Sequence, residues 1–416
     1  MAVSIDPSSA ESDRALVRDF SLHAIPDAFY DDPYPIYRAL QTLDPVHRMP
    51  DGSLFLTRHG DLEAIYKDTT RFSSDKKFEF APKYGIGSRL FEHHTTSLVF
   101  NDPPLHTRVR HLIAGALHPR AIAETEPRLI TLVDGLLDAM EARGSVDLIE
   151  DFASAIPIEV IGNLLGVPHA ERSPLRGWSL AILGALEPKL SPEVQACGER
   201  AVAEFLDYLR RLVADRRAKP GDADHDVLTR LIVGETADGA KLSEVELLHN
   251  CIFILNAGHE TTTNLIGNGL ELLLRYPDQK QRLIDDPALI RTAIEEFLRF
   301  ESSNQLGNRG VAVDTEIAGV PLPKGSLVTL CIGAANRDPA QFAAPDQLDI
   351  ARAPNRHLAF ASGAHVCAGL NLARMEGRIA IGRFIARFPN FEMAGVPRRA
   401  RRVRFRGFTA LPVTLG

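Results

Sequence analysis

The stretch FASGAHVCAG, residues 360–369, carries the most specific chemistry in the chain and precedes a helix predicted over 370–387. Cys367 therefore faces a helix N-terminus, where free N–H groups and the helix dipole stabilise a thiolate. Gly363 and Gly369 allow the backbone to approach a large flat group closely. These features suit an iron ligand. The alternative is a buried structural cysteine in a glycine-containing turn.

The composition is that of an ordinary globular protein. The 416 residues are 45% hydrophobic and 24% charged, and 47 basic against 54 acidic residues give a net charge of -7. This balance gives no reason to expect nucleic acid as a partner. Residues 1–15 lack the pattern of a signal peptide, and no apolar stretch approaches the roughly 20 residues of a membrane span. The four scattered cysteines favour reduced thiols, so we expect a cytoplasmic protein without a membrane partner.

Hydrophobic periodicity predicts one mainly helical (α+β) domain over residues 1–416, with small sheets at its edges and a short N-terminal tail at about 1–15. The longest predicted helix begins at Ser243, where the S-x-x-E spacing of a capping box occurs, and ends at Arg275. Because this helix is apolar around much of its circumference, we expect it at the centre of the fold.

Shorter elements follow from the same patterns. A second helix is predicted to start at Asp286-Pro287 and to end near Glu301. Residues 53–58 alternate enough to form an edge strand, residues 315–330 contain β-like segments, and residues 402–415 alternate like a strand or hairpin.

Two helical motifs add chemistry to this layout. Glu296 and Arg299 lie three residues apart, which places a carboxylate and a guanidinium on one helix face; taken alone, such a pair is usually a surface ion pair. Residues 257–262, AGHETT, place Gly258 in mid-helix at a cost of roughly 1 kcal/mol. A zinc-protease H-E-x-x-H motif is excluded because residue 263 is threonine.

FASGAHVCAG resembles the F-x-x-G-x-H-x-C-x-G haem loop of the cytochrome P450 family, with every fixed position present. Residues 296–299 and 257–262 resemble that family's E-x-x-R and [AG]-G-x-[DE]-T-T motifs, in the same order along the chain. The second motif binds oxygen in the family, so the resemblance implies a local opening for dioxygen that would explain Gly258. The likeness runs from residues 31–40 to 409–415 and is greatest for soluble bacterial members. It implies the cytochrome P450 fold, with the long central helix over a haem b whose iron takes the Cys367 thiolate as axial ligand.

The resemblance also implies roles for individual residues. Glu296 and Arg299 would lock the core beneath the haem, while Glu260 and Thr261 would form the acid–alcohol pair that delivers protons when dioxygen is activated. The other residues implied in haem binding are His106, Arg110, Arg309 and His365 at the propionates, and Phe360, Gly369 and Ala257 beside the ring. Buried propionates need such charge-assisted partners.

Two positions depart from the family pattern. Gln347 stands where an arginine often joins the E-x-x-R pair, and Arg352 is the nearest substitute. Ala361 replaces a more usual glycine, a change that we expect to cost little.

The expected function is a haem-thiolate monooxygenase that hydroxylates or O-dealkylates a small organic substrate. Because the catalytic fold uses the whole chain, electrons should come from a separate ferredoxin and ferredoxin reductase, with NAD(P)H acting only through them. The alternatives are a peroxide-driven peroxygenase, a haem-thiolate isomerase or dehydratase, and a non-catalytic haem gas sensor. We expect a monomer.

The resemblance places substrate-pocket residues in segment 80–99, on the central helix, at 304–306 and at the C-terminal turn. They are His93, His94, Phe253, Asn256, Asn304, Gln305, Phe408 and Thr409. The polar members predict a substrate with a polar or anionic group, because a buried amide without a partner costs about 1–3 kcal/mol. The alternative is that Asn304 and Gln305 bond to the backbone and that the histidines face solvent.

The same resemblance predicts where a small acidic ferredoxin would dock, namely on the cysteine side of the haem. The residues of this predicted basic patch are Arg108, His118, Arg120, Arg356 and Arg374. The alternative is that they are ordinary solvated side chains.

Overall fold

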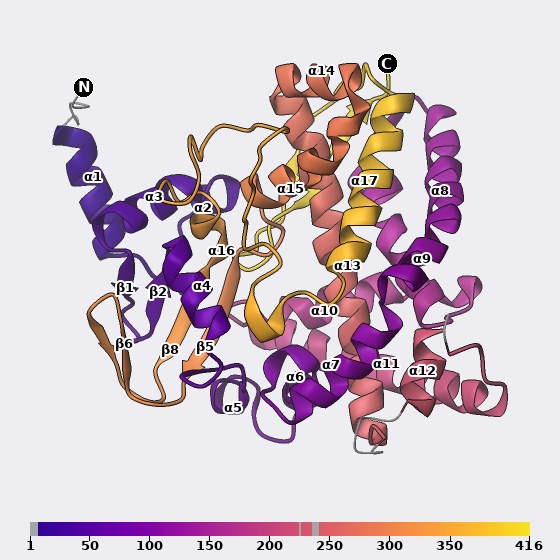
Figure 1. Cartoon of the computed structure of the whole chain (residues 1–416), viewed down its shortest axis with the longest axis horizontal. Helices are drawn as coiled ribbons and strands as arrows, with labels where there is room; N and C mark the ends of the chain where they lie inside the picture. The colour runs from indigo at the N-terminus through magenta and orange to yellow at the C-terminus, as the bar shows by residue number, and fades with distance from the viewer. Residues whose placement is uncertain (1–6, 224–225, 235–240) are drawn as a thin grey trace.

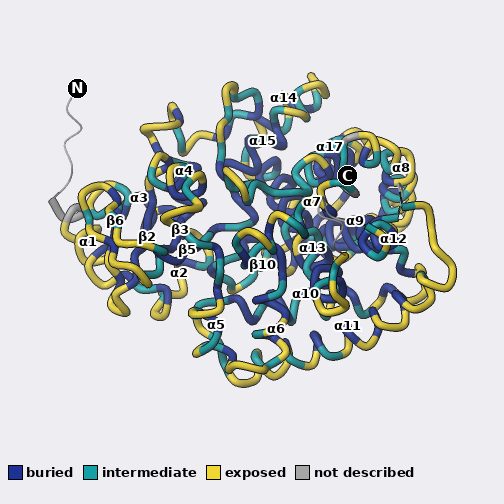
Figure 2. Tube along the Cα trace, turned by 60° about the horizontal axis from the view of Figure 1, so that its bottom comes forward, coloured by how far each residue is buried: buried dark blue, intermediate teal, exposed yellow. Residues whose placement is uncertain are grey.

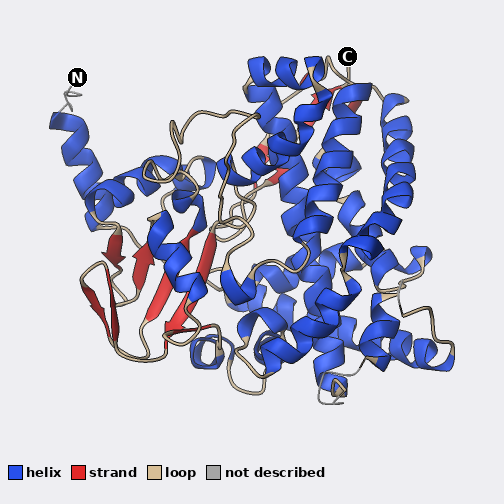
Figure 3. Ribbon diagram, in the orientation of Figure 1, coloured by secondary structure: helices blue, strands red, loops and turns tan. Residues whose placement is uncertain are grey.

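The computed structural model describes residues 7–223, 226–234 and 241–416. A helix-rich part lies beside a smaller part built around a sheet (Figure 1), a division that Figure 3 makes plain by colour. The helices are α1 (Pro7–Arg18), α2 (Asp27–Asp31), α3 (Tyr34–Leu43), α4 (His59–Lys67), α5 (Lys77–Tyr84), α6 (Arg89–Thr96), α7 (Leu105–Ala116), α8 (Pro119–Glu141), α9 (Ala155–Leu164), α10 (Leu175–Gly184), α11 (Pro192–Ala218), α12 (Val227–Val233), α13 (Glu244–Arg275), α14 (Pro277–Asp285), α15 (Ile290–Phe300), α16 (Ile332–Ala335) and α17 (Leu370–Arg387).

The strands are short and belong to several small sheets. They are β1 (Val46–Arg48), β2 (Leu54–Leu56), β3 (Phe72–Ser73), β4 (Ser145–Asp147), β5 (Leu306–Val311), β6 (Thr315–Ile317), β7 (Val320–Leu322), β8 (Leu327–Cys331), β9 (Glu392–Met393), β10 (Arg398–Arg399), β11 (Phe408–Ala410) and β12 (Pro412–Thr414). This combination confirms the predicted mainly helical α+β class.

The central helix is α13, as predicted. Ser243 accepts a hydrogen bond from the Glu246 backbone N–H, and the Glu246 carboxylate accepts one from the Ser243 N–H, so the predicted capping box is present. Leu255, Ile266 and Leu270 on α13 have no exposed surface. Buried positions gather around this helix while exposed ones follow the outer turns (Figure 2).

The largest sheet has the strand order β1-β2-β8-β5-β3. The prediction of an edge strand at 53–58 was wrong, because β2 lies between β1 and β8 and pairs in parallel with β8. Leu54, Phe55 and Leu56 are all buried. A strand covered on both faces reads as a continuous apolar run rather than as an alternating one.

Three other predicted boundaries change. Residues 402–415 contain strands, β11 and β12, but these do not form a hairpin, because β11 pairs with β10 while β12 pairs with β4 and β9. Only Leu411 separates these strands, which is too little for a hairpin loop. The helix predicted from 286 begins as a 3₁₀ turn, Pro287–Leu289, before α15. Helix α1 occupies part of the predicted N-terminal tail, and residues 1–6 of that tail lie outside the described residues.

A buried ion pair ties α15 to the irregular segment before the cysteine loop. Arg299 donates to both oxygens of Glu296 at 2.7 and 2.8 Å, and neither side chain has exposed surface. Arg299 also donates to the carbonyl oxygens of Asn336 and Pro345. Arg352 donates from Nε to both Glu296 oxygens at 3.2 and 3.1 Å, so it takes the place left by Gln347.

We predict that Arg299→Lys destabilises the protein by about 3–5 kcal/mol, because one ammonium cannot satisfy a buried carboxylate and two buried carbonyls together. The matched control is Arg383→Lys. Arg383 pairs bidentately with Asp134, but the Arg383 side chain is 43% exposed and the Asp134 side chain is 40% exposed. The control should cost under about 1 kcal/mol. Urea unfolding midpoints that move equally in the two variants would contradict the prediction.

Candidate active site

The cysteine loop folds through tight local contacts. The Cys367 N–H donates to the Phe360 carbonyl oxygen at 3.0 Å. Gly363 has φ of 67°, and a Cβ there would lie 2.3 Å from the Tyr66 carbonyl oxygen on α4, so only glycine fits. Ala361 also has a positive φ, 57°. The expectation that alanine costs little here was wrong, since the left-handed region costs an L-residue about 1–2 kcal/mol.

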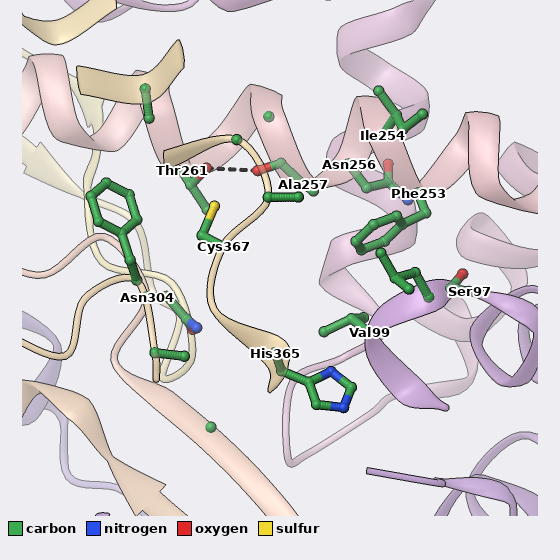
Figure 4. A pocket seen from close by; sticks show the side chains of 18 of the residues that line it. Ser97, Val99, Phe253, Ile254, Asn256, Ala257, Thr261, Asn304, His365 and Cys367 are labelled. Carbon is green, nitrogen blue, oxygen red and sulfur yellow. Dashed lines mark hydrogen bonds between the residues drawn. The ribbon is translucent and has the colours of Figure 1, made fainter. Parts of the chain in front are cut away.

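The loop faces a large cavity beneath α13. Figure 4 shows Thr261 and Ala257 on α13, with Cys367 and His365 on the loop and Asn304 on another wall. The sequence-predicted residues that line it are His93, His94, His106, Arg110, Phe253, Asn256, Ala257, Thr261, Asn304, Arg309, Phe360, His365, Cys367 and Gly369. Of the four cysteines, Cys367 alone lines this cavity.

Two opposing effects act on the pKa of the Cys367 thiol. Burial raises its pKa, while the Gly369 N–H and the charges of Arg110 and Arg374 lower it. The predicted effect of the helix N-terminus is therefore present but is outweighed by burial. A bound metal cation would deprotonate such a thiol outright.

Four basic side chains converge at one side of the cavity. The rings of His106 and His365 lie 4.0 Å apart, and Nε2 of each is buried without a hydrogen-bond partner. Burial is the main reason that their pKa values fall, that of His365 to about 3. Arg309 is buried over the Tyr66 ring, at 5.1 Å from its centroid, and Arg110 completes the group.

These residues fit a haem. The two orphaned histidine nitrogens and the two guanidinium groups supply the donors that carboxylates need. A Cβ at Gly369 would meet nothing within 4 Å, so the backbone beside Cys367 leaves room for a flat ring. Cys367 would bind the iron, and His106, Arg110, Arg309 and His365 would hold the propionates.

Thr261 and Glu260 occupy different environments. Thr261 lines the cavity and donates to the Ala257 carbonyl oxygen at 2.8 Å, which leaves the hydroxyl oxygen as an acceptor. Glu260 is buried, lies outside the cavity lining, and accepts 2.5 Å hydrogen bonds on both oxygens from Arg402. Burial raises the pKa of Glu260, and Arg402 partly lowers it.

Gly258 has a packing role that the sequence did not reveal. A Cβ there would lie 2.2 Å from Cδ1 of Ile161 on α9, and α13 continues as helix through this position. Close packing of two helices, rather than a local opening, therefore accounts for this glycine.

Three predicted pocket residues do not line the cavity. Gln305 donates to the Ser302 carbonyl oxygen at 2.7 Å, Phe408 is buried in the core, and Thr409 is exposed. The C-terminal wall lies four residues earlier, at Arg404 and Phe405, because Phe405 forms a β-bridge with Asn304.

The other polar pocket residues divide into two groups. With its amide oriented to donate, Asn304 bonds to the carbonyl oxygens of Arg404 and Leu306 at 3.3 and 3.2 Å, so its partners are backbone groups. His93 and His94 are buried rather than facing solvent. His93 Nδ1, His94 Nε2 and Asn256 Oδ1 have no hydrogen-bond partner.

The structure adds three ionisable lining residues that the sequence analysis missed, Lys76, Arg404 and Glu376. Burial raises the pKa of Glu376 to about 8, although the Thr262 hydroxyl bonds to it and lowers it. Burial lowers the pKa of Lys76 to about 8. Glu376 lies nine residues after Cys367 on α17, a spacing that could have pointed to it; Lys76 and Arg404 carry no comparable signal.

Known proteins resemble this chain over nearly all of its length. Residues 186–402 match the cytochrome P450 family model. Vitamin D(3) 25-hydroxylase from Pseudonocardia autotrophica is 38% identical, with 93% of this chain and 95% of that protein covered. The Biotin biosynthesis cytochrome P450 of Bacillus subtilis (strain 168) is 35% identical, with 93% and 97% covered.

Solved structures agree with these relatives. P450BioI, in complex with hexadec-9Z-enoic acid ligated acyl carrier protein, superposes with a TM-score of 0.88 at 34% identity, with 94% of this chain and 100% of that chain covered. Myxobacterial cytochrome P450 CYP267B1, in complex with myristic acid, gives a TM-score of 0.86 at 34% identity, with 94% and 98% covered. The chain therefore belongs to the cytochrome P450 family of haem-thiolate oxidoreductases.

Proposed function

We propose that this cytochrome P450 hydroxylates or O-dealkylates a small organic substrate that combines an apolar body with a polar or anionic group. The observation that carries the monooxygenase function is the convergence of Cys367 and Thr261 on one cavity, with Glu260 adjacent on α13. The haem would activate dioxygen, and the protein would supply orientation, protons and exclusion of water. The intact acid–alcohol pair disfavours a peroxygenase, an isomerase or dehydratase, and a gas sensor.

The polar part of the substrate proposal rests on unsatisfied groups in the cavity wall. Burial lowers the pKa values of His93 and His94, so both rings are neutral near pH 7. Each neutral ring offers one donor and one acceptor. Together with Asn256 Oδ1, these atoms need a ligand or water to complete their hydrogen bonds. The myristic acid bound in the related CYP267B1 structure supports a substrate of this amphiphilic kind.

We predict that Cys367→His abolishes the red-shifted Soret band of the reduced, carbon-monoxide-bound protein, because imidazole cannot replace the thiolate. Cys197→Ser, Cys251→Ala and Cys331→Ala should retain that band, since all three thiols lie outside the cavity lining. Carbon-monoxide difference spectra of the four variants provide the measurement. A red-shifted band in Cys367→His would refute the ligand assignment.

Proton delivery would divide between Thr261 and Glu260. The Thr261 hydroxyl oxygen would accept a hydrogen bond from water in the cavity and so hold a proton donor close to the reacting oxygen. Glu260 would receive protons from solvent and pass them on after it leaves Arg402. Arg402 holds Glu260 between such steps, because a buried carboxylate keeps a charged partner.

We predict that Thr261→Ala retains haem but diverts reducing equivalents into hydrogen peroxide, because the hydroxyl no longer holds the proton donor. Thr261→Ser, which keeps the hydroxyl, should preserve most of the coupling. Glu260→Gln should instead slow turnover by about 10²-fold or more, as expected for loss of a general acid. Product formed per NAD(P)H consumed separates these effects. Wild-type rate and coupling in both Thr261→Ala and Glu260→Gln would contradict the assignment.

Electrons would come from a ferredoxin and its reductase, and we propose a monomeric cytoplasmic enzyme. Within the described residues, no helix is long and apolar enough to cross a bilayer. In the predicted basic patch, Arg374 pairs with Glu295 at 2.7 Å, Arg108 pairs with Glu246, and His118 caps α8 through Nδ1. The side chain of Arg120 lies 3.7 Å from Glu124 but is 88% exposed, and Arg356 is exposed, so these two are best placed to meet an acidic partner.

We predict that reversing Arg120 and Arg356 together to glutamate slows reduction by an acidic ferredoxin at low salt and that the difference shrinks as salt rises. Charge steering is screened over about 10 Å at 0.1 M salt. Arg200→Glu, an exposed position on α11, is the control and should leave the rate unchanged. Stopped-flow reduction rates that are flat with ionic strength in all proteins would rule out this docking surface.

A further inference from the structure

Two basic side chains reach the cavity from segments far apart in the sequence. Lys76 directly precedes α5, and Arg404 lies in the C-terminal segment before β11. Lys76 is 1% exposed. Its Nζ and the Nε of Arg404 are buried without any hydrogen-bond partner. These are the strong donors of the lining that the haem-loop motifs do not account for.

Nearby groups do not satisfy Lys76. Its Nζ lies 3.4 Å from a Glu79 oxygen, but Glu79 accepts hydrogen bonds on both oxygens from the Asn308 amide at 3.0 and 3.1 Å. The carboxylate is therefore shared rather than dedicated to the ammonium group. A buried donor left in this state costs about 1–3 kcal/mol, and a charged one costs more.

The Arg404 guanidinium is held in place by one hydrogen bond, but its Nε has no hydrogen-bond partner. Nη1 donates to the Leu306 carbonyl oxygen at 3.0 Å, which leaves Nε free. The Glu187 carboxylate accepts the backbone N–H groups of Val403 at 2.8 Å and Arg404 at 3.4 Å. Glu187 thus positions the chain that carries Arg404 without pairing with its guanidinium.

The two cations act on the same region. The charge of Arg404 contributes to the lowered pKa values of Lys76, Lys83 and His94, although burial is the larger cause for each. The Glu79 carboxylate partly offsets this effect at Lys76, where burial still lowers the pKa to about 8. Like charges in a buried wall repel one another, and an added anion reduces that repulsion. A guanidinium and an ammonium group that line the same cavity can both donate to one carboxylate.

We propose that Arg404 and Lys76 form an anion subsite that binds the carboxylate of the substrate. The apolar body would then lie along Leu183, Leu186 and Phe253, which line the same cavity. This inference rests on the proposed function and narrows its substrate class to monocarboxylic acids with a hydrocarbon body. A haem propionate offers the same carboxylate chemistry, so the test must separate these two sources.

The probes are dodecanoate and 1-dodecanol, which share a chain and differ in charge. Their dissociation constants are measured by calorimetry with haem-loaded wild type, Arg404→Gln and Lys76→Gln. We expect each variant to bind dodecanoate at least tenfold more weakly and dodecanol less than twofold more weakly. Lys77→Gln is the matched control, since this exposed neighbour pairs with Asp75 at 2.7 Å and should change neither constant.

Three outcomes would overturn the proposal. The first is that wild type binds dodecanol as tightly as dodecanoate. The second is that the variants bind both ligands equally more weakly. The third is that the variants lose haem while keeping the preference for dodecanoate. The last result would assign the two cations to a propionate. Arg404→Lys keeps the positive charge and should therefore keep most of the preference for dodecanoate over dodecanol. That result would show that Arg404→Gln weakens binding through loss of charge and not through misfolding. Because binding is measured without turnover, failure of the monooxygenase function would appear separately, as haem-loaded protein that oxidises nothing.

Discussion

Satisfying the buried Glu296 carboxylate is the constraint on which the position of the cysteine loop depends. Arg299 and Arg352 both donate to it, as do the Asn355 amide and the Asp349 N–H. These donors come from α15 and from the segment between α16 and the cysteine loop, which has little secondary structure of its own. A buried charge that loses a partner costs about 3–5 kcal/mol, so the network fixes the path of that segment and hence the place at which the loop begins.

The same requirement organises the acid beside the cavity. Glu260 is buried and therefore needs a charged partner, which Arg402 provides while also donating to the Leu180 carbonyl oxygen on α10. The acid is consequently held outside the cavity lining, whereas its neighbour Thr261 faces the cavity. The two adjacent residues on α13 thus differ in role, because the Glu260 side chain contacts Arg402 and the Thr261 side chain lines the cavity.

Polar groups are distributed unevenly around the cavity. Lys76 and Arg404 bring basic groups into the lining, while Leu183 on α10 and Phe253 and Leu265 on α13 contribute apolar side chains. Such a division favours one orientation for an amphiphilic ligand, since reversing it would bury a charge against hydrocarbon. A substrate held in one orientation presents one part of its chain to the iron, and this is how a cavity of this kind can impose regioselectivity.

The amino-acid sequence alone determined the mainly helical class and the bounds of α13 and α17, because local periodicity and capping encode them, and the motif resemblance implied that Cys367 and Thr261 share one site. Tertiary structure decided what depends on contacts between distant segments. Only packing showed that β2 is an inner strand and that Arg402 holds Glu260. The β-bridge between Asn304 and Phe405 likewise sets which C-terminal residues face the cavity. Sequence spacing carries no information about such pairings, since each joins segments about a hundred or more residues apart whose register is set by packing.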